Sequence, residues 1–506
     1  MMSSYPTPIE RLAGKHLLVL NWRDVQHPQA GGAEQYMHQI AVRWARAGAL
    51  ITWVTGRGPG QTAHEIIDGI NVIRSGGDLS LYPAAALWLL RSGQSFDGVI
   101  DCQNGIPFFS PLFLRRAMPI VQVIHHVHQD QFATRFSSPL ATVGRFLEKD
   151  AARLVYGKRS IAAVSPSTRM ELRRRLGYTS PIFVVPNGTT QPPEEVGPRD
   201  PDPTITVVSR LVPHKRIDLL LGQIAVAAEA IPRLRVNIVG DGPERARLQK
   251  IAADLGLLSA VTFHGYQPNE VRDALLSRAW ITASTSAAEG WGCSVIEANA
   301  WGVPCVALRV PGIRDSVVDG ETGWLVDDAK DFGTAMVKAI DAVSDLTTAR
   351  TITDACRAWA ARFTWDRSAA LLAGVLVEES GFTGDFRVQR RRARSDMAAH
   401  ARFRSPARFD PYRALRATDE VVEDGDEICA LLHGCDETDA RSVLHRLGIF
   451  DAEVTLANRS GVLAGPALPP SSGPAETPGV DTNAPTGGPA QQPDPGSFPT
   501  SDLGTP

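Results

Sequence analysis

Two glutamates eight positions apart frame a glycine-rich turn in the stretch EGWGCSVIE, from Glu289 to Glu297. A strand is predicted to end at Ser284, and a helix is predicted to begin near Gly292, so Glu297 lies about one turn into that helix. The first amides of a helix favour an anion, phosphate above all. Because carboxylates accept hydrogen bonds from sugar hydroxyls, the spacing suits a molecule with a sugar on each side of a diphosphate. Two solvated glutamates on a capped surface loop would have the same spacing.

Two other loops carry residues that suit the same chemistry. The loop SRLVPHKRID follows the strand TITVVS and contains Arg210 and Lys215, two cations that can clamp a diphosphate. The segment QAGGAEQ places Gly31 and Gly32 at a strand-to-helix turn, where the backbone can approach a ligand closely. Alone, these loops are equally typical of a solvated basic turn and a tight strand-to-helix turn.

Two further loops bear on cofactors. VGDGPE is a glycine-rich turn that does not satisfy GxGxxG, so a nicotinamide-dinucleotide site is not supported. IHHVHQD clusters three histidines after the strand PIVQV, and at least one of them should point from the strand end into a cleft. The cluster has neither HExxH spacing nor a neighbouring cysteine, which argues against a metal site.

The elements around these loops alternate between short strands and amphipathic helices. One series runs from HLLVLNW to PIFVVPNG, and a second runs from TITVVSRL to GWLVD, after a linker-like segment at 191–203. Such alternation predicts parallel sheets built from βαβ units. We therefore expect an α/β protein with two doubly wound domains facing each other across a cleft, and ligands beyond the carboxyl ends of the strands.

Composition narrows the class of protein. A chain of 506 residues is long enough for several domains, and its net charge of -3 gives no support for nucleic-acid binding. No apolar run approaches the roughly 18 residues of a membrane helix, and the N-terminus lacks the features of a signal peptide. Six scattered cysteines without a CxxC pair favour free thiols in a reducing compartment, so we expect a cytoplasmic protein.

The C-terminal part differs in kind from the rest. An arginine-rich run begins at Arg387, an acidic stretch occupies 419–427, and EICALLHG and DARSVLHRLGIF predict a small helical piece. From 461 onward the chain is rich in Pro, Gly, Ser and Thr and cannot bury enough apolar surface to offset its ordering entropy, so we expect disorder.

The motifs, taken together and in order, resemble those of the retaining glycosyltransferases of family 4, which have the GT-B fold. EGWGCSVIE matches the family's EX7E pattern. Around it stand QAGGAEQYMHQIA, the strand-end histidines, VVPNG, VSRLVPHKRIDLLL, IVGDGPERARL, FHGYQPNE and FTWDRSA. The likeness covers roughly 15–380. One departure is Trp-Gly-Cys after the first Glu-Gly, where the family often has Phe-Gly-Leu, and Trp291 could alter which sugar fits.

The resemblance implies a division into domains. Residues 1–196 would form the acceptor-side Rossmann-like domain, and 197–365 the domain that binds a nucleotide sugar. Residues 366–380 would be a crossover helix that packs back on the first domain. A basic and then acidic extension, 381–460, and a disordered tail, 461–506, would follow.

The resemblance also implies a role for each matching residue. Glu289 would face the hydroxyls of the transferred sugar, and Glu297 would bind the ribose. Arg210 and Lys215 would neutralise the diphosphate leaving group, so no metal would be required and the nucleotide sugar would be the co-substrate. The remaining matches are the phosphate loop (Gly31, Gly32), the backbone around the sugar and distal phosphate (Trp291, Gly292, Cys293, Ser294), the border of the nucleobase (Asp241, Gly242, Gly265) and a histidine beside the sugar (His125, with His126 as the alternative).

Several questions stay open at the level of sequence. UDP and GDP sugars are both compatible with the motifs, and the acceptor is not identified. A nucleotide-sugar epimerase or phosphorylase on the same fold, and a non-catalytic nucleotide-sugar-binding scaffold, are alternatives. The arginine-rich run would suit peripheral contact with an anionic membrane on its inner face and a lipid-linked acceptor in cell-envelope glycan or glycolipid synthesis. Pairing of the same arginines with the acidic stretch 419–427 is an equally good interpretation.

Overall fold

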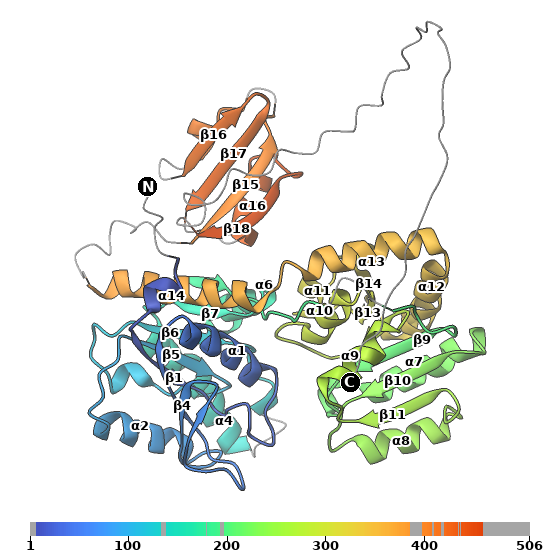
Figure 1. Cartoon of the computed structure of the whole chain (residues 1–506), viewed down its shortest axis with the longest axis horizontal. Helices are drawn as coiled ribbons and strands as arrows, with labels where there is room; N and C mark the ends of the chain where they lie inside the picture. The colour runs from blue at the N-terminus through green and yellow to red at the C-terminus, as the bar shows by residue number, and fades with distance from the viewer. Residues whose placement is uncertain are drawn as a thin grey trace, which may run out of the picture. The chain divides into compact units, whose positions relative to one another are not determined.

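The computed structural model describes residues 7–132, 138–178, 180–192, 197–384, 397–406, 409–415, 419–433, 435 and 437–458. The tail for which we expect disorder, 461–506, lies outside them. The described residues contain two parallel α/β sheets and one small antiparallel sheet (Figure 1).

The first sheet has eight strands in the order β3-β4-β2-β1-β5-β6-β7-β8, all parallel except the β3–β4 hairpin. The strands are β1 His16–Leu20, β2 Leu50–Thr55, β3 His64–Ile67, β4 Ile70–Arg74, β5 Gly98–Gln103, β6 Ile120–Ile124, β7 Ile161–Ala163 and β8 Ile182–Val184. The helices between them are α1 Gly32–Arg46, α2 Leu81–Arg91, α4 Ser138–Phe146, α5 Ala152–Tyr156 and α6 Pro166–Glu171. The central strands β5 and β6 are buried along their whole length and are mostly apolar, with Asp101, Gln103 and Gln122 as buried polar exceptions.

The second sheet is assembled from two groups of three parallel strands, in the orders β11-β10-β9 and β12-β13-β14. A parallel bridge between Ile205 and Ile281 joins the two groups. The strands are β9 Thr204–Val208, β10 Arg235–Val239, β11 Val261–Gly265, β12 Thr282–Ser284, β13 Cys305–Leu308 and β14 Gly323–Val326. The helices are α7 Ile217–Ala230, α8 Arg245–Asp254, α9 Asn269–Ser277, α10 Cys293–Ala300, α11 Ile313–Ser316, α12 Phe332–Ser344 and α13 Leu346–Ala360.

The long helix α14, Trp365–Gly384, returns to the first sheet. The indole nitrogen of Trp44 in α1 donates to the carbonyl of Ala369 at 3.0 Å, and Arg159 forms an ion pair with Glu379 at 3.1 Å. Gly98 in β5 leaves room for Leu376, since a Cβ on this glycine would lie 3.1 Å from the leucine side chain. Helix α1 is therefore buried on most of its sides, because the sheet covers one face and α14 another.

The described residues between 397 and 458 include an antiparallel sheet with the strand order β16-β17-β15-β18 and one longer helix (Figure 1). Its elements are β15 Met397–Arg404, α15 Pro411–Ala414, β16 Glu420–Asp424, β17 Glu427–His433, α16 Glu437–Arg446 and β18 Glu453–Asn458. Helix α16 occupies part of the predicted helical piece, but the prediction of helix for EICALLH was wrong. Ile428, Ala430 and Leu432 alternate along β17 and are buried beside α16 residues in one core, which is the periodicity of a strand.

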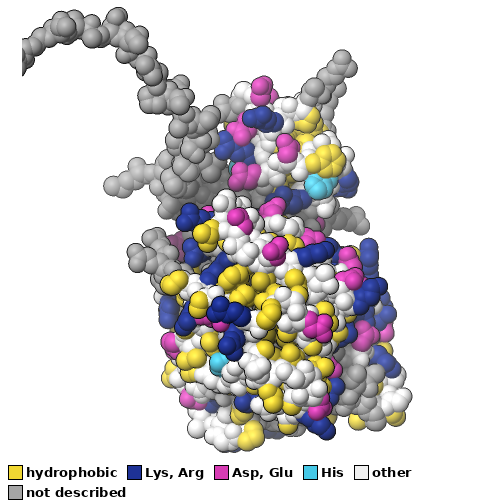
Figure 2. Space-filling model, turned by 90° about the vertical axis from the view of Figure 1, so that its right-hand side faces the viewer, with side chains coloured by type: hydrophobic (Ala, Val, Ile, Leu, Met, Phe, Trp, Pro, Cys, Tyr) yellow, Lys and Arg dark blue, Asp and Glu magenta, His cyan; other side chains and the backbone are white. Residues whose placement is uncertain are grey.

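Charge on the described surface is mixed. In the view of Figure 2, Lys and Arg side chains are interspersed with Asp and Glu, and hydrophobic side chains gather in one area. Part of the arginine-rich run lies in β15, where Arg402 forms an ion pair with Glu427 of the acidic stretch. Within the described ranges, no helix has both the length and the hydropathy of a membrane-crossing segment.

Candidate active site

The EGWG turn connects β12 to α10. Glu289 lies in the loop, Gly292 is the N-cap of α10, and Glu297 lies in the second turn of the helix. No side-chain hydrogen bond caps the start of α10 at Gly292, and a Cβ at this position would lie 2.2 Å from the hydroxyl of Ser316. The chain therefore needs glycine here to bring the start of α10 against α11.

Gly290 is the point at which this turn touches the first sheet. A Cβ on Gly290 would lie 2.0 Å from the carbonyl oxygen of His125, just after β6. The hydroxyl of Thr168 in α6 donates to that carbonyl at 3.4 Å and to the Gly290 carbonyl at 3.3 Å. Glycine at 290 thus allows the strand end that carries the histidines to lie against the EGWG turn.

Lys215 and Glu289 form an ion pair, and both side chains are largely buried. The hydroxyl of Ser286 donates to the same carboxylate at 2.7 Å, and the hydroxyl of Thr285 donates to the Lys215 carbonyl at 3.2 Å. Arg216, in the left-handed region with φ of 51°, ends the short 3-10 turn Pro213–Lys215 and begins α7. The sequence places these residues far apart, and this backbone turn brings the ammonium onto the carboxylate.

Glu297 and Cys293 share the start of α10. Burial raises the pKa of Glu297, the positive charge of Arg272 opposes that rise, and the side-chain carboxylate of Glu297 makes no hydrogen bond within the described ranges. Burial, followed by the charges of Glu297 and Glu289, raises the pKa of the Cys293 thiol to about 12. The thiol is therefore neutral at pH 7 and does not supply a thiolate nucleophile.

The glycine loop of the first domain faces Arg210 of the second. Gly31 is the N-cap of α1, and its amide donates to the Glu34 carboxylate at 2.8 Å. A Cβ on Gly31 would lie 3.8 Å from a guanidinium nitrogen of Arg210, whereas a Cβ on Gly32 would meet nothing within 4 Å. Glu34 was missed in the sequence analysis, although a glutamate three residues after the N-cap is a capping-box signal.

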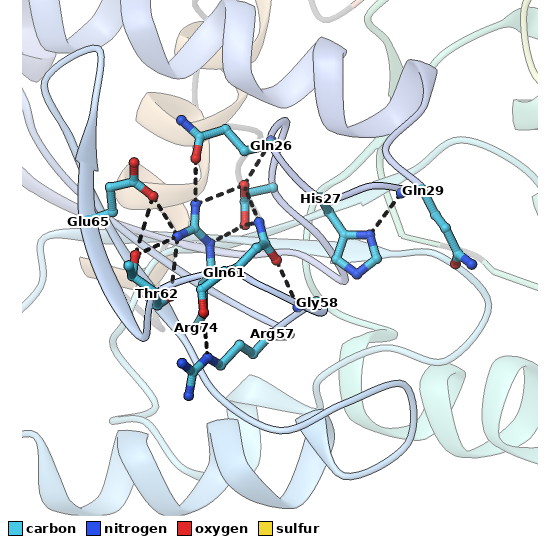
Figure 3. A network of polar contacts seen from close by, with 10 residues as sticks. Gln26, His27, Gln29, Arg57, Gly58, Gln61, Thr62, Glu65 and Arg74 are labelled. Carbon is cyan, nitrogen blue, oxygen red and sulfur yellow. Dashed lines mark hydrogen bonds and ion pairs between the residues drawn. The ribbon is translucent and has the colours of Figure 1, made fainter.

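A buried ionic network holds the loop that leads to Gly31 (Figure 3). Arg74 at the end of β4 donates to both carboxylate oxygens of Asp24, at 2.7 and 3.1 Å, and to Glu65 at 2.7 Å. Gln26 and Gln61 complete the cluster around Asp24 and Arg74. These contacts fix the start of the loop that ends at the glycines.

The two candidate histidines have different surroundings. The ring of His125 meets Tyr36 of α1 edge-on at 4.8 Å, and its Nε2 is buried without a hydrogen-bond partner among the described atoms. The ring of His126 instead meets His128 at 5.3 Å. Burial and then the charge of His128 lower the pKa of His125 to about 4, and burial with the charges of His128 and His214 lowers that of His126 to about 3. Both imidazoles are neutral at pH 7, and His126 is the one influenced by the second domain.

The residues expected at the nucleobase lie together, and Arg245 joins them. Asp241 accepts from the amide of Gly242 at 2.8 Å and pairs with Arg245 at 2.7 Å. Gly265 has a φ of +70°, and a Cβ there would lie 2.8 Å from a guanidinium nitrogen of Arg245. Arg245 was not singled out in the sequence, because a single arginine after a glycine-rich turn gives no distinctive signal.

The indole of Trp291 is buried and packs against Phe363, with the ring centroids 5.0 Å apart. We therefore expect Trp291 to act on a ligand in the EGWG turn through its backbone. Ser294, in the first turn of α10, is partly exposed. The described residues contain no group of three or more His, Cys, Asp and Glu side chains arranged to hold a metal ion.

Two family models match the two Rossmann-like domains. Residues 30–191 match "Glycosyltransferase Family 4", and residues 190–353 match "Glycosyl transferases group 1". The chain therefore belongs to the family 4 glycosyltransferases, which are retaining enzymes with the GT-B fold.

The curated relatives match part of the chain. GDP-mannose-dependent alpha-(1-6)-phosphatidylinositol monomannoside mannosyltransferase of Mycolicibacterium smegmatis is 34% identical over 182 residues, which are 34% of this chain and 47% of the relative. D-inositol 3-phosphate glycosyltransferase of Mycobacteroides abscessus is 34% identical over 227 residues, which are 43% of this chain and 48% of the relative. The chain thus spans about half the length of these relatives.

Solved structures agree on the fold. Sucrose-phosphate synthase from Thermosynechococcus elongatus superposes with a TM-score of 0.60 at 21% identity, over 73% of this chain and 100% of that one. WaaG, a glycosyltransferase involved in lipopolysaccharide biosynthesis, superposes with a TM-score of 0.57 at 16% identity, over 71% of this chain and 99% of that one. These matches confirm the predicted α/β fold of two Rossmann-like domains.

Proposed function

We propose that this chain transfers a sugar from a UDP or GDP sugar to an acceptor hydroxyl with retention of anomeric configuration. Two observations carry the proposal: Lys215 pairs with Glu289 just before α10, and Arg210 of the second domain approaches Gly31 of the first. Membership of the family supports the reaction class.

In this proposal the diphosphate lies between the glycine loop and the start of α10. Arg210 and Lys215 meet the charge that develops on the diphosphate as the glycosidic bond breaks. Glu289 exchanges its ion pair with Lys215 for hydrogen bonds to sugar hydroxyls, and Glu297 accepts from the ribose. Because two fixed cations supply the positive charge, we propose that no divalent metal is needed.

The acceptor side is proposed to be the first domain, and the acceptor to be lipid-linked. One relative supports this choice by name, since it is a phosphatidylinositol monomannoside mannosyltransferase, whereas another is named for D-inositol 3-phosphate, which is not a lipid. A chain that modifies such a lipid would contact a membrane surface peripherally, and the arginines after α14 suit an anionic one. The first of these relatives is also GDP-mannose-dependent, which supports GDP-mannose as the first sugar donor to test.

The test is incubation with labelled UDP and GDP hexoses and a panel of acceptors that includes phosphatidylinositol lipids and free sugars, with EDTA present. We expect labelled product from one sugar donor and one acceptor class, and NMR of the product should show the anomeric configuration of the sugar donor. A sugar that changes while still attached to its nucleotide would indicate the epimerase. Tight nucleotide binding without turnover on any acceptor would indicate the scaffold.

A further inference from the structure

A cavity of about 330 Å³ lies where the two Rossmann-like domains, the crossover and α16 meet. Its lining comes from segments far apart in the sequence and is mostly apolar. The lining residues that matter here are Trp291, Trp359, Arg362, Phe363, Glu437 and Arg441. Trp291 is the one lining residue here that belongs to the EGWG turn. Neither Lys215 nor Glu289 lines the cavity, so the cavity is separate from that ion pair.

Three aromatic rings form one wall of this cavity. Phe363 meets Trp291 and Trp359 edge-on, with ring centroids 5.0 Å apart in both pairs. The guanidinium of Arg362 lies over the Trp359 ring at 5.1 Å. Edge-on rings with a gap beside them suit a flat or compact apolar body.

One buried donor at the cavity has no partner. Trp291 is 6% exposed, and its indole nitrogen makes no hydrogen bond in the described part of the chain. The neighbouring indole of Trp359 donates to the Ser316 carbonyl at 2.9 Å. A buried N–H without an acceptor is costly, and a ligand that brought an acceptor atom to the Trp291 indole would relieve that cost.

The charged groups at the cavity leave one cation without an acidic partner. Glu437 of α16 accepts from Arg367 at 2.6 Å and from Arg362 at 3.4 Å, and Asp315 accepts from the Ser167 amide at 2.8 Å. Arg441 donates to two backbone carbonyls, Ala452 at 3.2 Å and Val454 at 3.4 Å, and forms no ion pair with a described acidic residue. The lining therefore carries three arginines (Arg362, Arg367 and Arg441) against two carboxylates (Asp315 and Glu437).

We propose that this cavity binds an amphipathic organic anion, with an apolar ring against Trp291, Trp359 and Phe363 and an anionic head at Arg441. The site is distinct from the proposed nucleotide-sugar site and does not depend on the proposed reaction. Tight binding needs both parts of the ligand, because the aromatic wall contacts the apolar ring and Arg441 of α16 binds the anionic head.

The test compares two fluorescent probes that share an apolar body. 1-Anilinonaphthalene-8-sulfonate carries a sulfonate, and N-phenyl-1-naphthylamine lacks it. We expect the full chain to bind one equivalent of the sulfonate probe, more tightly than the neutral probe. Arg441→Gln should lower the affinity for the sulfonate probe by roughly 10-fold, because the variant loses a hydrogen bond to a charged group. The affinity for the neutral probe should change little. Arg441→Lys should restore most of the difference, which a merely structural role of Arg441 would not explain.

Two further variants make the result decisive. Trp291→Phe keeps an aromatic ring but removes the N–H, and it should lower the affinity for the sulfonate probe. Arg247→Gln, on the exposed side of α8, is the matched control and should leave binding unchanged. Equal binding of the two probes by the full chain, or binding that neither Arg441→Gln nor Trp291→Phe alters, would overturn the proposal.

Discussion

At the scale of single residues, the proposed active site contains a carboxylate, that of Glu297, that is costly to keep charged. The carboxylate of Glu297 is mostly buried and has no hydrogen-bond partner among the described residues, and burial raises its pKa. Such a residue is retained at a cost in stability when it serves a ligand. The carboxylate of Glu289, in contrast, pairs with Lys215 and accepts a hydrogen bond from Ser286.

The cost at Glu297 predicts a pH-dependent gain in stability for Glu297→Gln. Folding raises the pKa of the Glu297 carboxyl above its usual value of 4.5. The contribution of this carboxyl to stability is therefore fully present below pH 4.5 and is lost as the pH rises through the raised pKa, where the buried group must become charged. The thermal midpoint of Glu297→Gln should therefore exceed that of the wild type by roughly 1–3 °C at pH 8 and by less at pH 5. Differential scanning fluorimetry at both pH values checks this, with the exposed Glu321→Gln as control. A difference that is the same at both pH values would contradict the assignment.

At the scale of elements, glycines and buried ions set how the strand-end loops meet. Gly290 allows the EGWG turn to touch the end of β6, and Arg74 anchors the loop that leads to α1. Neither residue needs to contact a substrate to affect the reaction. Each can be tested by its effect on both stability and ligand affinity.

Gly290→Ala should lower both the thermal midpoint and the affinity for a nucleotide. The new Cβ would lie 2.0 Å from the His125 carbonyl oxygen, so the turn and β6 must move apart. Gly222→Ala in α7 is the control, because a Cβ there meets nothing within 4 Å and alanine should add about 0.5–1 kcal/mol of helix stability. A Gly290→Ala protein as stable as Gly222→Ala would show that the contact with β6 is absent.

Arg74→Met should destabilise the first domain by about 3–5 kcal/mol, because it leaves the buried Asp24 carboxylate without its cation. Urea unfolding measures the loss, and limited proteolysis should show faster cleavage between β1 and α1. The exposed Arg247, which pairs with Asp218 and Glu244, provides the comparison, and Arg247→Met should cost far less stability than Arg74→Met. Similar costs for the two variants would mean that Arg74 is not a structural anchor.

Much of the element order was predictable because central parallel strands such as β1 are rich in apolar residues and helices such as α7 carry a clear apolar stripe. The strand β17 was missed, since a short apolar run such as EICALLH fits a helix or a strand equally well. For the candidate site, spacing located Glu289, Glu297 and Lys215 on the correct elements. The approach of Arg210 to Gly31, and of Arg245 to Gly265, comes from tertiary packing that no local pattern records.

At the scale of the whole chain, the arginine-rich run after α14 has two interpretations, namely contact with an anionic membrane and pairing with the acidic stretch 419–427. Arg402 pairs with Glu427 inside the small sheet, which agrees with internal pairing for that arginine. The arginines between α14 and β15 lie outside the described residues. They are Arg387, Arg390, Arg391, Arg392 and Arg394.

Replacing these five arginines with glutamine should weaken binding to anionic vesicles in a salt-dependent way. Each basic residue near an anionic surface contributes about 1 kcal/mol, so the variant should lose most of its binding at low salt. Co-sedimentation with phosphatidylserine-containing and neutral vesicles measures this. Equal sedimentation of the two proteins with the anionic vesicles would rule out the peripheral contact.

The central claim is that Lys215 and its neighbours form a binding site for the diphosphate of a nucleotide. Isothermal titration calorimetry of the full chain with UDP and with GDP, without metal, tests it most directly. We predict one-to-one binding of one of the two nucleotides, a loss of roughly 10-fold or more in affinity for Lys215→Ala, and unchanged affinity for the exposed Lys330→Ala. Absence of binding at millimolar nucleotide, or equal affinity of Lys215→Ala and the wild type, would contradict the account.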